Sequence, residues 1–352
     1  MKNKFNIYCS FACLREIYDQ CTKPISDFVN GDNIAIWVNL YILVYEKSQL
    51  FIDLTDEELH KLTKENPFFN KLFKEDKIIA VAENFQKIGK EDTILQKIPP
   101  KTLFFLDKTP IECKNLEDDF GLIFISKEEL SKKATWLFSW AVRNVQKKNG
   151  NHKNWDFLKK FRHPCNALLL ADNHILNDKR LWKENLLSVL QNLLPERLNK
   201  QIFELTIFRE VIKTPNANQL LKNEFDELEA ILKQTFDYEI NLTIIPTYEI
   251  HDRNILTNYA WFNSGYGFNL FKNGIVEKST TITFLPFSYL NTDYQKYDSL
   301  QVIDKQKINV VAEIVTSFLD QFKNINDKSE NSSDNKIIWF TSNCSKQNRL
   351  LR

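Results

Sequence analysis

The sequence has little of several things, and each shortage excludes a class of protein. Its formal net charge is only +1, whereas a chain built throughout to bind nucleic acid is usually strongly basic. Any nucleic-acid contact must therefore be local. The most apolar segment, residues 34–45, includes Asn39 and is too short to span a bilayer. Glycine and methionine are scarce while lysine and asparagine abound, which indicates an AT-rich coding bias and not a function.

The six cysteines are too dispersed for a metal centre. No Cys-x-x-Cys pair occurs, and His163 is the only histidine close to a cysteine, Cys165. Zinc sites need tighter clusters than this, so we expect no metal and no cofactor. No signal peptide precedes the cysteines, and free thiols in a reducing cytoplasm are the better explanation. We expect a cytoplasmic protein without a transmembrane segment.

Length and composition predict an α/β protein of two domains. A chain of 352 residues is long for one core, and its 43% of apolar residues can fill two. Short apolar runs at residues 5–9, 103–106 and 122–125 read as strands. Capped helical segments at residues 55–73 and 110–116 separate them. We expect a small α/β domain over residues 1–130, a basic aromatic helical connector over 131–163, and a second α/β domain over 164–352.

The first domain faintly resembles PIN-type nucleases, whose first strand normally delivers an aspartate for magnesium. Cys9 and Ser10 stand at that place in this sequence. Glu117, Asp118 and Asp119 form an acidic run that is more simply a solvated turn. A nuclease function for this half is therefore unsupported by the sequence.

The expected connector carries an excess of positive charge. Between Lys127 and His163, ten Lys or Arg residues face three Asp or Glu. Tryptophans interleaved with these cations are the ingredients of a nucleic-acid groove. The alternative is stronger, because Trp136, Leu137, Trp140 and Ala141 repeat at helical spacing and would lie on the buried face of one helix.

The second half contains a strand that ends in an acid. The apolar run from Asn166 to Ala171 leads into Asp172 and His174, as a buried strand with a carboxylate at its exit would. Helically spaced leucines follow, and then another apolar run at residues 202–208. The order strand, helix, strand is expected.

The stretch from His251 to Gly267 is the most informative, because a chemical spacing can be checked along it. The candidate site residues in it are His251, Asp252, Arg253, Asn258, Gly265, Tyr266 and Gly267. An imidazole can attack phosphorus, a cation can hold phosphate oxygens, and a carboxylate can orient an imidazole. A plainer alternative is a hydrogen-bonded turn at residues 251–253, with the two glycines supplying only positive φ angles.

This stretch resembles a worn phospholipase-D signature. The signature runs His-x-Lys, four residues, Asp, six residues, Gly-Ser, and here Arg253, Asn258 and Tyr266 stand at three of its places. With the strands before it, the segment from about 164 to 345 is similar to the carboxy-terminal domain of the MIT-domain-containing protein family. The resemblance implies a phospholipase-D-like fold without the full catalytic set. Bacterial relatives are often found in defence operons, and animal members bind membrane phosphoinositides.

Two functions follow as hypotheses. The first is a phosphate- or nucleic-acid-recognising module with a degenerate pocket around His251, Arg253 and Asn258, to which Asp172, His174, Asp252, Gly265, Tyr266 and Gly267 contribute ligand contacts. Such a module would serve a bacterial defence system, with a protein partner encoded in the same operon. The alternative is a phosphodiesterase or nuclease with His251 as nucleophile. Complete enzymes of this superfamily use two motifs, so a chain with one would act as a homodimer.

Overall fold

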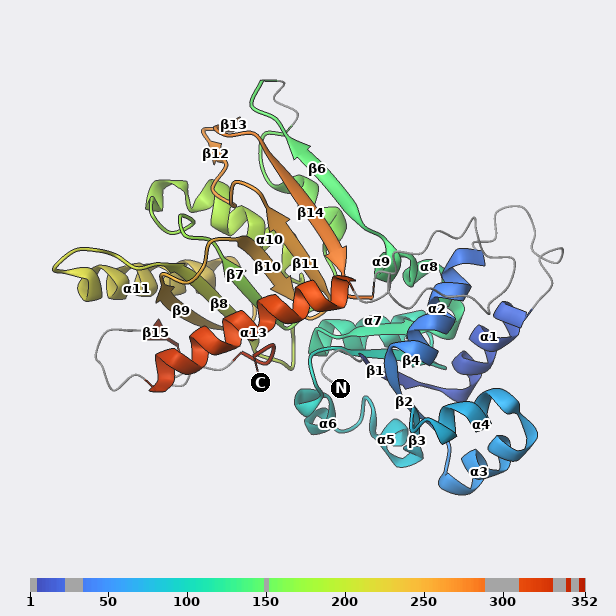
Figure 1. Ribbon diagram of the computed structural model, residues 1–352. Helices are drawn as coiled ribbons and strands as arrows, with labels where there is room; N and C mark the ends of the chain where they lie inside the picture. The colour runs from blue at the N-terminus through green and yellow to red at the C-terminus, as the bar shows by residue number, and fades with distance from the viewer. Residues whose placement is uncertain are drawn as a thin grey trace. The chain divides into compact units, whose positions relative to one another are not determined.

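The computed structural model describes residues 5–22, 34–148, 152–288, 310–331, 340–342 and 348–351. It confirms the α/β class, with one parallel and one mixed sheet (Figure 1). The chain separates into two compact units. The first comprises Met1–Ser139 and Ser288–Thr316, and the second comprises Trp140–Phe287 and Ser317–Arg352.

The first unit contains a five-stranded parallel sheet in the order β3-β2-β1-β4-β5. Its strands are β1 (Phe5–Cys9), β2 (Ser48–Ile52), β3 (Ile78–Ala80), β4 (Thr102–Leu106) and β5 (Ile123–Ser126). Every residue of β4 and of β5 is buried. This burial explains their unbroken apolar sequences, because a parallel sheet is covered by helices on both faces. The expected strand at residues 5–9 is confirmed to the residue.

Helices connect these parallel strands. They are α1 (Phe11–Thr22), α2 (Ile34–Glu46), α3 (Asp56–Glu65), α4 (Pro67–Lys74), α5 (Ala82–Lys87), α6 (Asp92–Lys97) and α7 (Pro110–Phe120), with η2 (Lys127–Glu129), α8 (Leu130–Lys133) and α9 (Thr135–Phe138) after the last strand. The capping box that Thr55 forms with Glu58 is confirmed. The single helix expected over residues 55–73 is wrong, because Asn66 ends α3 and caps α4. The residue before a proline disfavours helical backbone angles, and Pro67 is that proline.

The acidic run at the end of α7 is not the solvated turn that the sequence indicated. Glu117, Asp118 and Asp119 lie inside the helix. The Glu117 side chain is buried, accepts a hydrogen bond from the backbone N–H of Phe124, and pairs with the Lys133 ammonium at 3.2 Å. One member of the run therefore ties α7 to β5 instead of facing water.

The second unit contains an eight-stranded mixed sheet in the order β15-β9-β8-β7-β10-β11-β14-β6. Its strands are β6 (Ala141–Val145), β7 (Ala167–Ala171), β8 (Phe203–Glu210), β9 (Ile240–Thr247), β10 (Arg253–Thr257), β11 (Ala260–Ser264), β14 (Thr280–Pro286) and β15 (Phe340–Thr341), and β12 (Phe271–Lys272) pairs separately with β13 (Ile275–Val276). β7, β8 and β9 are parallel, whereas β10, β11, β14 and β6 continue the sheet in antiparallel fashion. The strand, helix, strand order expected after residue 164 is present.

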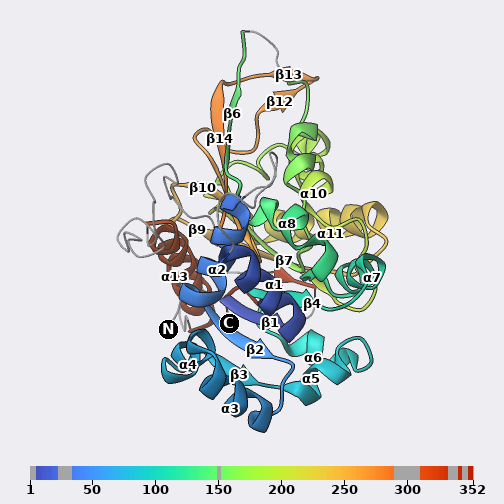
Figure 2. The ribbon, with the colours of Figure 1, turned by 90° about the vertical axis from the view of Figure 1, so that its right-hand side faces the viewer.

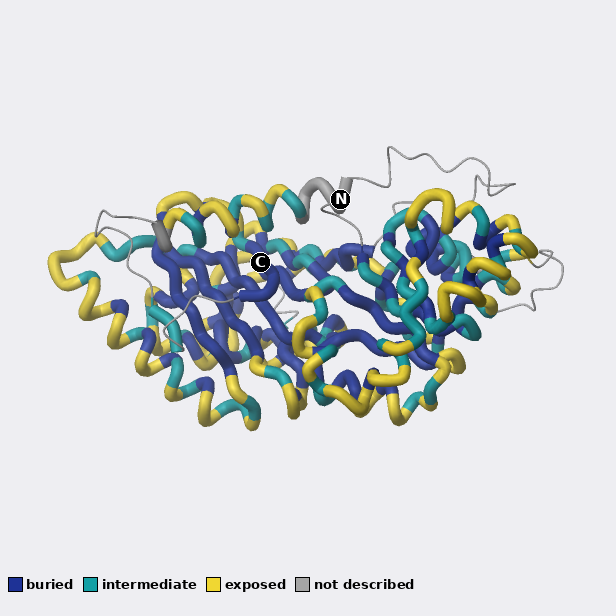
Figure 3. The backbone as a smooth tube through the Cα atoms, turned by 90° about the horizontal axis from the view of Figure 1, so that it is seen from below, coloured by how far each residue is buried: buried dark blue, intermediate teal, exposed yellow. Residues whose placement is uncertain are grey.

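Helices cover both faces of this mixed sheet. The second unit's helical segments are η3 (Asp156–Phe161), η4 (Lys179–Leu181), the π-helical η5 (Lys183–Leu187), α10 (Ser188–Leu193), α11 (Ala217–Thr235) and, from Ser317 on, α13 (Val310–Asn331). Figures 1 and 2 show α10 and α11 on one face and α13 across the other. Phe322 of α13 stacks on Phe208 of β8 with ring centroids 4.9 Å apart. In Figure 3 the strands are largely buried while the outer sides of the helices are exposed.

The helical connector expected over residues 131–163 is wrong. From residue 131 to Ser139 the chain forms only the short helices α8 and α9. Ala141 then begins β6, which pairs with β14. Trp140, expected in a helical core, is 55% exposed. The pairing partner of β6 lies about 140 residues later in the chain, and such a tertiary contact overrides the local helical spacing.

In the carboxy-terminal part, α13 ends at Asn331 and β15 covers Phe340–Thr341. The five cysteines within the described residues are free, and Cys344 lies outside them. No helix in the described part of the chain is both long and apolar enough to cross a membrane.

Candidate functional site

The register of three strands brings distant residues to one edge of the mixed sheet. Asn254 of β10 pairs with Ala171 of β7, which places Arg253 beside the exit of β7, where Asp172 stands. Arg253 in turn pairs with Ser264 of β11, so Gly265 follows at the same edge. In an antiparallel pair of strands, the start of one strand lies next to the end of the other.

These residues enclose a pocket of about 410 Å³. It is lined by Asp172, His174, Arg253, Gly265, Tyr266, Asn269 and Lys278. Five of the seven were expected from the sequence as site residues. Asn269 and Lys278 were not expected. Asn269 follows the Gly265-x-Gly267 pair at a position that no motif marks, and Lys278 precedes β14 in a segment without a recognisable pattern.

Asp172 forms the floor of this arrangement and is 1% exposed. One carboxylate oxygen accepts the backbone N–H of His174 at 2.8 Å, and the other accepts that of Phe268 at 2.6 Å. Burial raises the pKa of the Asp172 carboxyl, and the two N–H groups act in the opposite direction. Both oxygens are therefore already engaged by backbone donors.

Gly267 is required by this carboxylate. Its φ is +95°, and a Cβ built on it would lie 2.7 Å from Oδ2 of Asp172. Both the backbone angle and the space exclude a side chain at this position. Of the two glycines that the sequence marked, Gly267 has the positive φ and Gly265 does not. Ser264 donates its hydroxyl to the Gly267 carbonyl at 2.5 Å and fixes the turn.

Two cations face the pocket without a carboxylate of their own. Arg253 is half-buried, its Nε is shielded from solvent, and that atom has no hydrogen-bond partner among the described residues. The Lys278 ammonium lies over the Tyr266 ring at 4.6 Å from its centroid. No ion pair within 4.0 Å forms to either cation in the part of the chain that the structure describes. A guanidinium and an ammonium with free donors favour an oxyanion ligand.

The remaining lining residues add polar groups. Asn269 donates its amide to the His174 carbonyl at 3.4 Å, while its Oδ1 is buried without a partner among the described residues. The Tyr266 side chain is 53% exposed, and its backbone N–H donates to the Thr280 hydroxyl at 2.9 Å. The pocket thus presents the Tyr266 ring, the cations of Arg253 and Lys278, and amide groups to solvent.

Side-chain contacts connect His174 and Asn177, both exposed, with a buried ion pair. Asn177 donates its amide N–H toward Nδ1 of His174 at 3.2 Å, and its Oδ1 accepts from Arg209 at 3.0 Å. Arg209 is buried and pairs with Glu224 of α11. Burial raises the pKa of the Glu224 carboxyl, and the neighbouring guanidinium opposes that shift.

His251 and Asp252 are not brought into the pocket. Both are exposed in the bend that precedes β10, and neither lines the pocket. Side-chain alternation along a strand would separate Asp252 from Arg253, whereas His251 lies before the start of β10 and is not held by its strand pairing. The geometry does not place His251 as a partner of Arg253.

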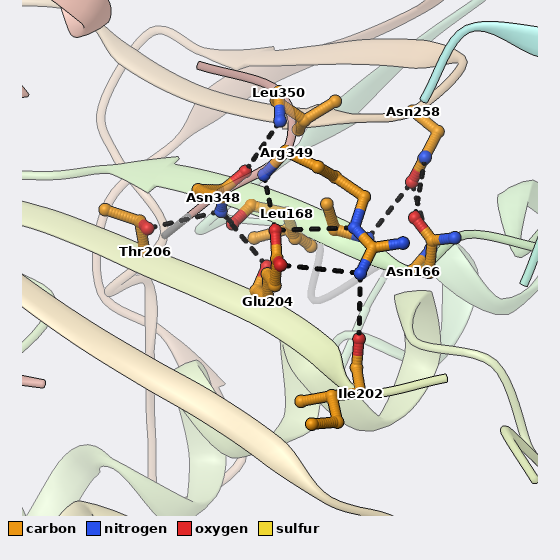
Figure 4. A network of polar contacts seen from close by, with 10 residues as sticks. Asn166, Leu168, Ile202, Glu204, Thr206, Asn258, Asn348, Arg349 and Leu350 are labelled. Atoms are coloured by element: carbon orange, nitrogen blue, oxygen red, sulfur yellow. Dashed lines mark hydrogen bonds and ion pairs between the residues drawn. The ribbon is translucent and has the colours of Figure 1, made fainter. Parts of the chain in front are cut away.

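Asn258 is also absent from the pocket, and its expected catalytic place is wrong. It follows β10 at the opposite end from Arg253, roughly 16 Å away at the usual rise per strand residue. Its Oδ1 accepts the backbone N–H groups of Asn166 and Ala167 at 3.0 and 3.1 Å. Its Nδ2 donates to the Asn166 side chain at 2.9 Å (Figure 4). Asn258 therefore anchors the start of β7.

Figure 4 also shows how residues 348–351 attach to the same end of the sheet. The Asn348 amide donates to the Leu168 carbonyl at 3.3 Å and to the Glu204 carbonyl at 3.1 Å. The Arg349 guanidinium pairs with the Glu204 carboxylate at 3.3 Å, and both side chains are at most 10% exposed. These buried polar groups satisfy one another, so this network is structural.

The first unit has its own hollow, of about 690 Å³, beyond the carboxyl ends of β4 and β5. Its lining mixes the acids Glu16, Asp107, Glu112 and Glu128 with Lys108 and Lys127. Asp53, at the exit of β2, instead accepts the backbone N–H of Phe11 at 2.6 Å. Within the described residues, no group of three or more His, Cys, Asp or Glu side chains could hold a metal ion.

Comparison with protein-family models and with curated proteins gives no match to this chain. The assignment of a function therefore depends on the geometry and charge of the pocket.

Proposed function

We propose that the second unit is a phosphate-recognising module whose pocket binds the phosphoryl group of a phosphorylated ligand or of nucleic acid. The observation that carries the proposal is the pair of cations, Arg253 and Lys278, beside a carboxylate whose oxygens are both engaged. The oxygens of a phosphoryl group would accept hydrogen bonds from the Arg253 and Lys278 donors. The sequence resemblance adds the proposal that the module belongs to a bacterial defence system.

The position of Asp172 supports binding of an anion despite its charge. A carboxylate that accepts two backbone N–H groups has fewer lone pairs to direct at a ligand. Arg253 and Lys278 together exceed its charge by one at neutral pH. The pocket is therefore locally cationic within a chain whose overall charge is close to zero, as a local nucleic-acid or phosphate contact requires.

The alternative, a dimeric phosphodiesterase with His251 as nucleophile, has no comparable support. His251 is exposed outside the pocket, and Asn258 anchors the sheet instead of orienting an imidazole. Hydrolysis by this pair would need a rearrangement of β10. The binding module is therefore the better supported of the two functions.

The test measures retention of inorganic phosphate, and of labelled single- and double-stranded DNA and RNA, by wild type and by Arg253→Gln. We expect saturable binding by wild type and a loss of roughly tenfold or more in the variant, because a charged hydrogen-bond donor is removed. Arg15→Gln is the matched control, since Arg15 lies on the exposed side of α1 in the first unit. Equal retention by wild type and Arg253→Gln would contradict the proposal, and cleavage that His251→Ala abolishes would establish the alternative.

A further inference from the structure

The hydrogen bonds behind His174 determine which of its ring nitrogens carries a proton. Arg209 is a donor only, so the Asn177 atom that faces it at 3.0 Å must be the carbonyl oxygen. The Asn177 NH₂ group then faces Nδ1 of His174. A ring nitrogen that accepts from an amide has a free lone pair, and the proton of a neutral imidazole must therefore be on Nε2.

A ring protonated on Nδ1 instead of Nε2 is disfavoured by the contacts of both His174 and Arg209. A proton on Nδ1 would face the Asn177 NH₂ group, donor against donor. Rotation of the Asn177 amide would relieve that contact but would turn its NH₂ toward the Arg209 guanidinium, whose side chain is 4% exposed and already held by Glu224. Either change loses a hydrogen bond, which favours the Nε2-protonated ring by roughly tenfold.

Nε2 is the nitrogen left for the pocket. His174 lines the pocket, and its Nε2 forms no hydrogen bond to any residue that the structure describes. Catalytic imidazoles have the opposite polarity, since a carboxylate accepts the proton of one nitrogen and leaves a lone pair on the other. Beside His174 the amide donor of Asn177 takes the place of that carboxylate. Nε2 of His174 therefore carries a proton, whereas a nucleophilic nitrogen would need a lone pair.

We infer that Asn177, held by Arg209, fixes His174 as a hydrogen-bond donor at Nε2, so that the pocket receives an oxyanion and does not attack it. The inference rests on the proposed phosphate-binding function of the same pocket and narrows its ligand. The atom that meets His174 is a hydrogen-bond acceptor, such as a deprotonated phosphoryl or sulfuryl oxygen. Asn177 is a positioning residue that acts through His174.

The ring state can be measured directly by long-range ¹⁵N–¹H correlation spectroscopy of the full chain labelled at histidine. The chain has five histidines, and a His174→Gln sample assigns the signal. We expect a protonated Nε2 and an unprotonated Nδ1 for His174 in wild type. A protonated Nδ1 with an unprotonated Nε2 would overturn the inference.

Asn177→Asp tests the positioning role, because a carboxylate would accept a proton from Nδ1 and reverse the ring. Inorganic sulfate is the probe. We expect the variant to bind sulfate about tenfold more weakly than wild type. In a His174→Gln background, where no ring can reverse, the same substitution should weaken sulfate binding less, because only the added charge acts there.

Other charged or titratable groups around the ring are the same in these variants, so the comparison removes their contribution to sulfate binding. They are Asp172, Arg253, Lys278 and Tyr266 in the pocket, and Arg209 and Glu224 behind Asn177. Asn177→Ala provides a variant without added charge. We expect it to give a mixture of ring states and a loss of sulfate affinity smaller than that of Asn177→Asp.

The outcomes separate the inference from the proposed function. An equal loss of sulfate affinity for Asn177→Asp with and without His174 would overturn the positioning role, because the added negative charge alone would then explain the loss. A wild-type protein that binds neither phosphate nor sulfate would overturn the proposed function and the ligand class together. The ring spectrum decides the state of His174 independently of either binding result.

Discussion

The backbone of Gly267 and the carboxylate of Asp172 occupy adjoining space, since a Cβ at Gly267 would lie 2.7 Å from Oδ2. The two residues are almost a hundred positions apart in the chain, and the backbone N–H of Phe268, next to Gly267, is held by the same oxygen at 2.6 Å. The turn that carries Tyr266 into the pocket is thus positioned by an acid from another strand.

Gly267→Ala should damage both the stability and the pocket. A side chain at a φ of +95° is strained by roughly 1–3 kcal/mol, and displacement of Asp172 adds to that cost. We expect a lower free energy of unfolding in urea and a weaker affinity for phosphate. Gly274→Ala is the matched control, because its φ is +70° but a Cβ there would meet only the Lys153 carbonyl at 4.0 Å, and Gly274 does not line the pocket. Equal losses in the two variants would contradict this account of Gly267.

Asn258 should matter for stability and not for ligand binding. Asn258→Ala leaves two buried backbone N–H groups without their acceptor, which costs roughly 2–5 kcal/mol of unfolding free energy. At a temperature where the variant stays folded, its phosphate affinity should equal that of wild type. A loss of affinity in a variant of normal stability would instead give Asn258 a place in the site.

Asn258→Asp restores the acid that the phospholipase-D signature has at this position. Because Asn258 lies at the far end of β10 from Arg253, we expect no hydrolysis of a phosphodiester by the variant and no change in phosphate affinity. A chromogenic phosphodiester gives the measurement. Activity gained in this variant, and lost again when His251→Ala is added, would show that the two residues can meet.

His163 should make the fold sensitive to acid. Its Nδ1 donates to the Phe161 carbonyl at 2.9 Å, so its Nε2 accepts from the Thr257 hydroxyl at 2.6 Å. Burial lowers its pKa to about 4, whereas an exposed histidine titrates near about 6.5. As the pH falls through this window the unfolded chain gains a proton that the folded chain does not, and the free energy of unfolding decreases by roughly 3 kcal/mol.

Urea unfolding of wild type and His163→Gln over the same pH range isolates this contribution, because the carboxylates titrate in both proteins. Glutamine can donate to Phe161 and accept from Thr257 without titrating. The difference in unfolding free energy between the two proteins should therefore shift in favour of the variant as the pH falls. Parallel pH profiles would mean that His163 is protonated in the folded protein.

The buried pair formed by Glu204 and Arg349 should show strong coupling. Arg349→Met leaves a buried carboxylate without its cation, and we expect a loss of roughly 3–5 kcal/mol. In the double variant with Glu204→Gln the loss should be smaller than the sum of the two single losses. Lys222→Met, which breaks an exposed pair with Asp226, should cost less than about 1 kcal/mol. Additive effects at Glu204 and Arg349 would contradict the coupling.

The sequence predicts the parts of this fold that depend on local pattern. The unbroken apolar runs at β4 and β7 and the capping box at Thr55 were recognisable, because burial and capping leave signals within a few residues. β6 was not, since its strand character comes from pairing with β14. A local helical spacing carries no information about such a partner.

The site was predictable to the extent that its residues adjoin strand ends. Asp172 and Arg253 were identified from an exit acid and a motif, and strand pairing does place them together. Asn258 was misplaced because the motif gives spacing but not the direction in which β10 runs. Lys278 enters the pocket only through the register of β14 against β11, which no sequence pattern expresses.

The attachment of residues 348–351 has a consequence for synthesis. The Asn348 amide meets the Leu168 carbonyl across 180 positions, and Arg349 meets Glu204 across 145. A ribosome needs roughly 10–30 s to add the residues between Glu204 and Arg349. During that interval the Glu204 carboxylate of β8 lacks its cation, so this part of the buried polar network of the second unit forms only after residue 349 has been added.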